Sequence, residues 1–128
     1  MKKIKFIKVM QAKDGNGLNQ YDDEGNSIMK TEIDEGYKET VFGHEEDGTL
    51  YEYDVYYSKT TDTKYKWQAT EGSTGLLICY GKTQATCADE VMFRLERMHK
   101  ILSYDHISLN MANMLDHCKE LVRNAKIQ

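Results

Sequence analysis

Proline is absent from this chain of 128 residues, tryptophan occurs once and cysteine occurs three times. Without proline, turns depend on glycine, asparagine and aspartate, which are frequent in the first half of the chain. Three cysteines with no continuous apolar leader segment indicate reduced thiols, not the disulfide framework of a secreted protein. No apolar run approaches the roughly 20 residues that span a bilayer. We therefore expect a cytoplasmic protein without a membrane segment.

The composition is that of a folded domain. Hydrophobic residues make up 40% of the chain and charged residues 30%, and the mean hydropathy is −0.69. These values favour a compact core under a polar surface over disorder. The length fits one domain, and we expect residues 1–128 to form a single unit.

Strand patterns fill the first two thirds of the chain. Residues 49–58 show the clearest alternation, with Tyr51, Tyr53 and Tyr57 on one face, and we expect tyrosines and many acids on an uncovered sheet face. The continuous apolar run over 76–80 is typical of a central strand. With turn signals between them, the predicted strands are 3–12, 27–33, 37–44, 49–58, 65–69 and 76–80.

Helical periodicity replaces alternation from about residue 85. One apolar stripe runs from Ala88 to Leu102 and a second begins at Ile107, out of phase with the first. We predict a break near 103–105, with Thr83 or Thr86 capping the first helix and Ser103 or Asp105 capping the second; one long bent helix is the alternative. The fold class is therefore α+β, with five to six antiparallel strands (about 3–81) and two C-terminal helices (about 85–125) packed on one face.

Acidic residues concentrate in the stretch from Asp14 to Asp54. It holds thirteen acidic residues against two lysines, a formal charge of −11 in a chain whose net charge is −4. Carboxylates on alternate strand positions lie about 6–7 Å apart, close to the phosphate spacing of nucleic acid. A basic nucleic-acid site on another protein is thus a candidate partner. The predicted partner-binding residues are Asp22, Asp23, Glu24, Glu45, Glu46, Asp47, Glu52 and Asp54.

All three arginines lie in the helical part of the chain. Arg94 and Arg97 share a helix face, and Arg123 follows on the second helix. Guanidinium groups bind phosphate in a bidentate manner, and Tyr104 offers a ring on which a base can stack. This set predicts, as an alternative, a site for a signalling nucleotide that is sequestered by a homo-oligomer.

No catalytic or metal-binding motif in the sequence has the residue spacing that its function requires. Asp14 begins a run like a calcium loop, but its twelfth position is Gly25 instead of glutamate. Five residues separate Gly75 from Gly81-Lys82-Thr83, whereas a phosphate-binding loop needs four. Cysteine and histidine do not follow zinc spacing, and Cys87, at a helix start, is the one candidate for an activated thiol. We expect no enzyme activity, no metal and no cofactor.

The segment from Gly75 to Ala88 is similar to the strand-to-helix turn of HicB-type antitoxins. It combines a strand, Gly81-x-Thr83 and an alanine-containing helix start. In its size, acidic hairpins and strand-then-helix order, the chain looks like small phage-encoded counter-defence proteins of the anti-CRISPR or Thoeris anti-defence type. The resemblance implies inhibition by binding inside a bacterial host cell. We therefore expect a non-enzymatic inhibitor of a basic host protein such as a nuclease, with a nucleotide sponge or an antitoxin or immunity protein as alternatives.

Overall fold

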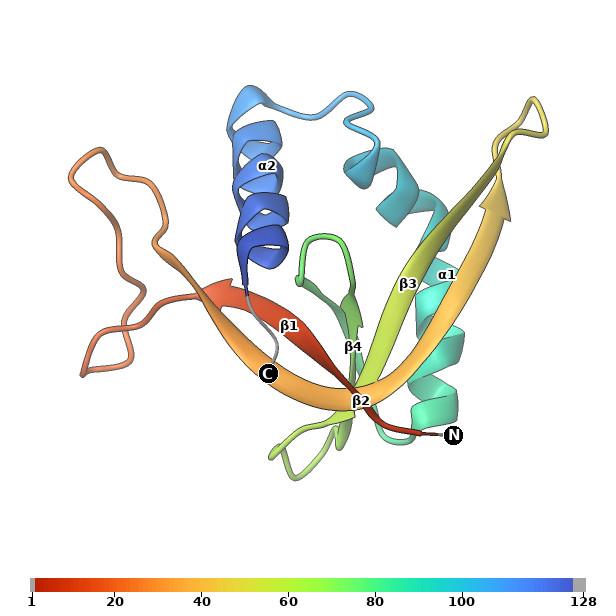
Figure 1. The fold of residues 1–128 in the computed structure, drawn as a ribbon, viewed down its shortest axis with the longest axis horizontal. Helices are drawn as coiled ribbons and strands as arrows, with labels where there is room; N and C mark the ends of the chain where they lie inside the picture. The colour runs from red at the N-terminus through yellow and green to blue at the C-terminus, as the bar shows by residue number, and fades with distance from the viewer. Residues whose placement is uncertain (1, 126–128) are drawn as a thin grey trace.

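A computed structural model describes residues 2–125 and confirms the α+β arrangement (Figure 1). In this part of the chain, five strands form one antiparallel sheet in chain order, and two helices follow. The elements are β1 (Ile4–Gln11), β2 (Met29–His44), β3 (Leu50–Lys59), β4 (Trp67–Glu71), β5 (Leu77–Gly81), α1 (Gln84–Leu102) and α2 (Leu109–Asn124). Among the described helices, neither has the length and hydropathy to cross a bilayer.

β2 is one long strand where the sequence predicted two. Its first half pairs with β1 up to Gly36, and its second half, from Tyr37, pairs with β3. At Gly36 the backbone passes so close to β3 that an added Cβ would lie 2.3 Å from the carbonyl oxygen of Tyr57. Glycine at this position thus permits a close approach of the two neighbouring strands, and β2 continues as one curved strand without a break (Figure 1).

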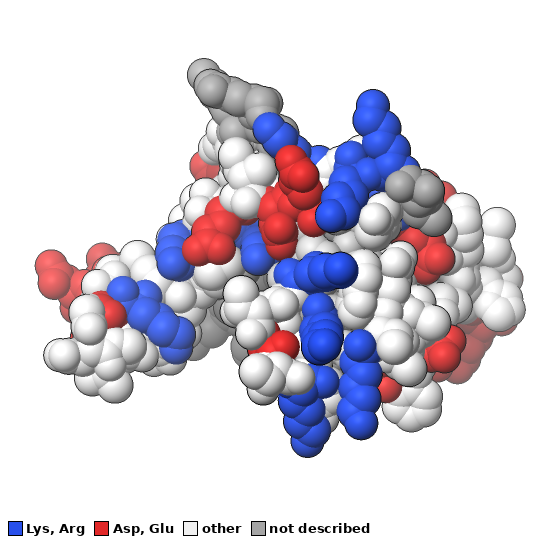
Figure 2. All heavy atoms as spheres, turned by 90° about the horizontal axis from the view of Figure 1, so that it is seen from below, with Lys and Arg blue, Asp and Glu red and all other residues white. Residues whose placement is uncertain are grey.

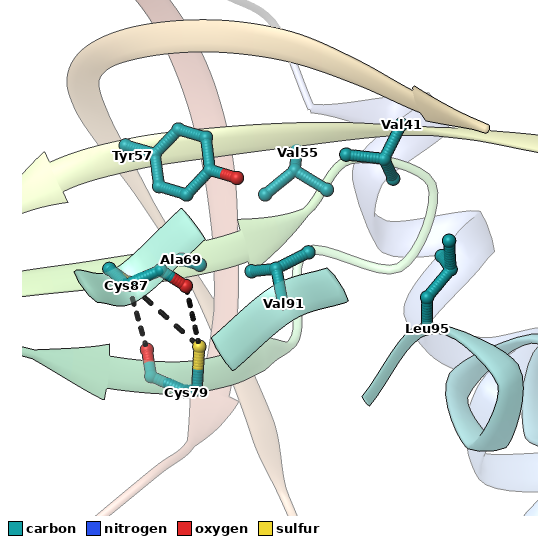
Figure 3. Close-up of a cluster of buried hydrophobic side chains, with 8 residues drawn as sticks. All are labelled: Val41, Val55, Tyr57, Ala69, Cys79, Cys87, Val91 and Leu95. Carbon is teal, nitrogen blue, oxygen red and sulfur yellow. Dashed lines mark hydrogen bonds between the residues drawn. The ribbon is translucent and has the colours of Figure 1, made fainter. Parts of the chain in front are cut away.

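The tyrosine-rich face of β3 is covered, which corrects the expectation that it is free. Tyr57 and Val55 pack beneath α1, against Cys87, Val91 and Leu95 (Figure 3). Tyrosine fits this position because its hydroxyl can keep a hydrogen-bond partner while its ring is buried. The Tyr57 hydroxyl donates to the carboxylate of Glu39 at 3.0 Å. The acids Glu52 and Asp54 alternate with the tyrosines and lie on the other face.

β5 is an edge strand, not the central strand that its apolar run indicated. It pairs only with β4 in the described sheet. α1 covers one of its faces, which accounts for part of its apolar character. Arg94 of α1 donates from Nη1 to the carbonyl oxygen of Ile78 at 3.0 Å. This contact satisfies one of the free carbonyls that an edge strand presents.

The predicted break between the helices is present, but the cap of the second helix was assigned to the wrong residues. Tyr104 and His106 adopt positive φ angles of 61° and 55°, which end the helical path. The hydroxyl of Ser108 accepts from the backbone N–H of Met111 at 3.1 Å and caps α2. Ser103 is instead the C-cap of α1. Thr83 caps α1 as expected, in a reciprocal pair with Thr86.

A second apolar cluster lies between β1 and α2. Ile7 and Val9 of β1 pack on Cys118 of α2, away from the cluster beneath α1. The turn between β4 and β5 touches this second cluster, because the backbone N–H of Val9 donates to the carbonyl of Gly75 at 2.8 Å. The described chain therefore has two packed cores, one for each helix.

Candidate functional site

The predicted acidic residues divide between two hairpin tips. Asp22, Asp23 and Glu24 lie in the hairpin between β1 and β2, and Glu45–Asp47 lie in the turn between β2 and β3. All of β2, sixteen residues, separates them, which is about 50 Å along the strand at roughly 3.3 Å per residue. The two tips project from opposite ends of the molecule (Figure 1). They are therefore two sites, not one continuous surface.

The tip between β1 and β2 uses an acid to close its own turn. The Asp22 carboxylate accepts from the backbone N–H groups of Glu24 and Asn26, at 3.0 and 2.8 Å. Gly25, with a φ of 82°, completes the turn. Aspartate is typical of this local role, so Asp22 has a structural explanation that needs no partner.

The other hairpin carries the remaining five acids, and we call its residues 40–54 the acidic arm. Glu45 is bound to His99, and Asp54 accepts from the Thr40 hydroxyl at 2.8 Å and pairs with Lys38 at 3.5 Å. In residues 2–125, Glu46, Asp47 and Glu52 have no cation within ion-pair distance. A backbone hydrogen bond from Thr49 lowers the pKa of Asp47, which keeps that carboxylate charged.

Two large apolar side chains share the outer face of the acidic arm. Phe42 is 59% exposed and Leu50 is 76% exposed. Phe42 lies directly opposite Glu52 in the strand register, and Leu50 lies opposite His44. An exposed aromatic and an exposed leucine thus lie beside these acids, and protein interfaces commonly combine an apolar centre with a polar rim.

His99 fixes the acidic arm to α1. Its ring stacks on Tyr51 with centroids 3.6 Å apart and planes 2° apart. Nδ1 is hydrogen-bonded to the Tyr53 hydroxyl at 2.7 Å, and Nε2 to the Glu45 carboxylate at 2.8 Å. One helix side chain thus contacts both β3 and the turn that joins β3 to β2, so the carboxylates are presented by an ordered hairpin.

Only some of the residues predicted to bind a nucleotide lie at one place in the structure. A cavity of about 670 Å³ lies between α1, α2 and the β4–β5 region, and both Arg94 and Arg97 line it. Arg94 is already engaged by Glu90 at 2.6 Å and by Ile78. Within the described chain, Arg97 has no carboxylate at ion-pair distance. The rest of the lining is mainly aliphatic and methionine side chains from both helices and β5.

Tyr104 and Arg123 do not line this cavity. The Tyr104 hydroxyl donates to Asp116 and accepts from Lys119, which holds the ring against α2. Arg123 lies in the last turn of α2. The structure therefore brings together two of the four residues of the predicted nucleotide site.

Cys87 lacks the surroundings of an activated thiol. It is fully buried, and its sulfur lies 3.9 Å from that of Cys79 (Figure 3). The contact with Cys79, together with burial, raises the pKa of Cys87. A raised pKa opposes thiolate formation, so its place near a helix start does not activate it. Among residues 2–125, no cluster of three histidine, cysteine or acidic side chains could hold a metal ion.

Sequence reasoning missed Phe42, Leu50 and His99. Phe42 and Leu50 could have been found, because both are large apolar residues at strand positions that alternate with the buried face. His99 carries no such signal, since its contacts depend on where α1 crosses the hairpin. Comparison with protein-family models, curated proteins and solved structures finds no match to this chain.

Proposed function

We propose that this chain is a non-enzymatic inhibitor, encoded by a phage or mobile element, that binds a basic nucleic-acid site on a host defence protein. The observation that carries the proposal is the acidic arm. Three carboxylates without an ion-pair partner among residues 2–125, those of Glu46, Asp47 and Glu52, accompany exposed Phe42 and Leu50 on a hairpin that His99 braces. A basic toxin would be a target of the same chemistry.

Charge and apolar contact have separate roles in this proposal. Carboxylates that face a basic cleft accelerate encounter and make association sensitive to salt. The exposed Phe42 and Leu50 supply buried area, which charge alone does not provide. Bracing by His99 lowers the entropy lost on binding, because the hairpin is already ordered.

The test is displacement of DNA from basic nucleases. Each purified nuclease of a panel is loaded with a fluorescent duplex oligonucleotide, and the chain is added while anisotropy is recorded. For a nuclease that it displaces, the variant Glu46→Lys/Asp47→Lys/Glu52→Lys is expected to bind about tenfold more weakly or worse at low salt. The matched control, Asp22→Lys/Asp23→Lys/Glu24→Lys, makes the same change in net charge at the other hairpin and is expected to retain affinity.

Two outcomes would contradict the proposal. Equal loss in the two charge-reversed variants would mean that net charge matters and the acidic arm does not. Full affinity in a Phe42→Ser/Leu50→Ser variant that remains folded would exclude the apolar part of the interface. Circular dichroism and a urea titration of each variant separate loss of binding from loss of structure.

The cavity favours a second candidate function, which is sequestration of a small ligand. Its volume of about 670 Å³ lies within the roughly 300–1,000 Å³ of ligand pockets. Arg97, which has no carboxylate at ion-pair distance among residues 2–125, offers its guanidinium at the cavity wall. A nucleotide that binds there is expected to raise the melting temperature of the chain and of Arg123→Gln, but less so that of Arg97→Gln. A melting temperature unmoved by cyclic and linear nucleotides would exclude this function.

A further inference from the structure

Basic residues gather at the end of β3 opposite the acidic arm. Lys59 ends β3, Lys64 and Lys66 lie in the loop to β4, and Lys82 follows β5. Trp67 and Gly81 are paired in the sheet, so Lys66 and Lys82 each lie one residue beyond that pair. Seen from below, basic side chains form a band across the middle of the molecule, with acidic side chains on both sides (Figure 2).

We call Lys3, Lys59, Lys64, Lys66 and Lys82 the basic band. All five are exposed. Within the part of the chain that the structure describes, no carboxylate lies within ion-pair distance of any of their ammonium groups. Other lysines do have such partners, as Lys8 does in Asp34 and Lys38 in Asp54. The charge of the basic band is therefore available to a ligand.

Aromatic rings lie between these lysines. The ammonium nitrogen of Lys59 is 5.8 Å from the ring centroid of Trp67, and that of Lys64 is 5.2 Å from the ring of Tyr65. Tyr37 flanks Trp67, with centroids 6.3 Å apart. A hollow of about 220 Å³ at this place is lined by Lys3, Lys59, Tyr37 and Trp67 among others.

The loop that carries part of the basic band is ordered by its own hydrogen bonds. The Asp62 carboxylate accepts from the backbone N–H groups of Lys64 and Tyr65, both at 2.7 Å. The backbone N–H of Thr60 donates to the carbonyl of Lys66 at 2.8 Å. The backbone that carries Lys64, Tyr65 and Lys66 is thus ordered. The Asp62 carboxylate accepts its hydrogen bonds within the loop.

Two other carboxylates stand at the edge of the hollow. Asp34 is paired with Lys8 at 3.2 Å, and Glu35 is the other acid in the lining. Positive charge therefore predominates over negative charge at this end of the sheet. The acidic arm, at the other end of β3, carries charge of the opposite sign.

We propose that the basic band and its aromatic side chains bind single-stranded nucleic acid. Lysines spaced around the half-buried ring of Trp67 and the exposed ring of Tyr65 suit a strand whose phosphates lie on the ammonium groups and whose bases stack on these rings. A duplex hides its base faces, so it can use the lysines but not the rings. The site is separate from the acidic arm, and its test does not depend on the proposed inhibitor function.

Trp67 is the only tryptophan in the chain, so its fluorescence reports directly on the site. The chain is titrated with an oligodeoxythymidylate at several salt concentrations, and in parallel with a duplex of equal length and with anionic phospholipid vesicles. The strand is expected to quench Trp67 and to bind more tightly than the duplex. The logarithm of its affinity should fall with the logarithm of salt, with a slope of about −0.7 per phosphate contacted.

Two variants separate the phosphate contacts from stacking. Lys59→Ala/Lys64→Ala/Lys66→Ala is expected to weaken binding at low salt and to reduce the salt slope by about 2. The matched control, Lys13→Ala/Lys30→Ala/Lys100→Ala, removes the same charge elsewhere and should retain both. Tyr65→Ala keeps all the lysines, and a loss of about fivefold or more is expected at unchanged slope.

The proposal is overturned by absence of strand binding, by equal affinity for strand and duplex, or by binding that leaves Trp67 fluorescence unchanged. Tighter binding to the vesicles than to the strand would assign the basic band to membranes instead. Equal losses in the two triple-lysine variants would show that the overall charge, and not this site, attracts the strand. A urea titration confirms that each variant is folded before it is compared.

Discussion

Gly36 allows β2 to lie close against β3, and its substitution is the sharpest test of the fold at a single residue. A Cβ at this position would lie 2.3 Å from a backbone oxygen of β3, which no rotamer change can relieve. We expect Gly36→Ala to lower the free energy of unfolding by about 2–3 kcal/mol, as overpacked sites do. Urea unfolding measures the change.

Gly15 is the matched control for this substitution. An added Cβ there meets no atom within 4 Å, so Gly15→Ala should change stability by no more than about 0.5 kcal/mol. Similar values for the two alanine variants would mean that β2 does not approach β3 at Gly36 as closely as described.

Ionisation of Tyr53 lowers the stability of the folded protein at alkaline pH. Burial raises its pKa to about 12, with nearby carboxylates such as Glu71 adding to the effect, whereas an unfolded tyrosine has a pKa of about 10. The folded state therefore favours the neutral phenol. The resulting stability is complete below pH 10 and is lost as the pH rises from about 10 to about 12.

The measurement compares urea midpoints of the parent and of Tyr53→Phe between pH 8 and about 11, a range that includes the tyrosine titration. The phenylalanine variant should be less stable at pH 8, because His99 loses a hydrogen bond, yet should lose less stability on further alkalinisation. Tyr21→Phe, changed at an exposed hairpin position, should follow the parent. Identical pH profiles for all three proteins would contradict a buried Tyr53 phenol.

At the scale of elements, His99 joins α1 to the β2–β3 hairpin. His99→Phe keeps a ring that can stack on Tyr51 but removes both hydrogen bonds, to Tyr53 and Glu45. We expect a loss of about 1–2 kcal/mol in the free energy of unfolding. Hydrogen exchange should increase in residues 40–54 more than in β4 or β5.

His117, which is exposed on α2, provides the control. His117→Phe should leave exchange in residues 40–54 unchanged. If His99→Phe also left that exchange unchanged, the hairpin would be ordered by its strand pairing alone. In that case the acidic arm would lose its bracing but keep its charges.

Local patterns predicted the element types well and the long-range arrangement poorly. The period of the apolar residues located both helices, and the Asp47-Gly48 signal located the hairpin turn. Strand alternation in β3 separated its two faces correctly but could not say which face a helix would cover. The sequence predicted separate strands over 27–33 and 37–44, because it does not reveal that Gly36 lets one continuous strand approach the Tyr57 carbonyl closely.

The candidate sites show the same contrast between local sequence signals and long-range arrangement. The acids of the hairpin tips were visible as charge, but their separation depends on the length of β2. The lysines of the basic band are spread from Lys3 to Lys82 in the chain and meet only because β1, β3, β4 and β5 end or begin at one side of the sheet. Such a cluster has no local sequence signature.

For the whole molecule, the contact between Gly75 and β1 links the two cores. Gly75 has a φ of +70°, and an added Cβ would lie 2.8 Å from a methyl group of Val9. Its turn is rigid, because the buried Glu71 carboxylate accepts four hydrogen bonds from Ser73 and Thr74. Gly75→Ala should therefore push the turn away from β1 without unfolding the turn itself.

The expected result is a selective loss of order. Hydrogen exchange should increase in β1 and α2, whose cluster includes Val9 and Cys118, more than in α1, whose cluster lies elsewhere. Gly48→Ala is the matched control, since Gly48 has a φ of +87° but an added Cβ meets no atom within 4 Å. It carries the same backbone strain of about 1–2 kcal/mol at a hairpin tip and should spare β1 and α2. Equal increases in hydrogen exchange in α1 and α2 of Gly75→Ala would contradict this expectation. They would mean that the two cores unfold as one unit.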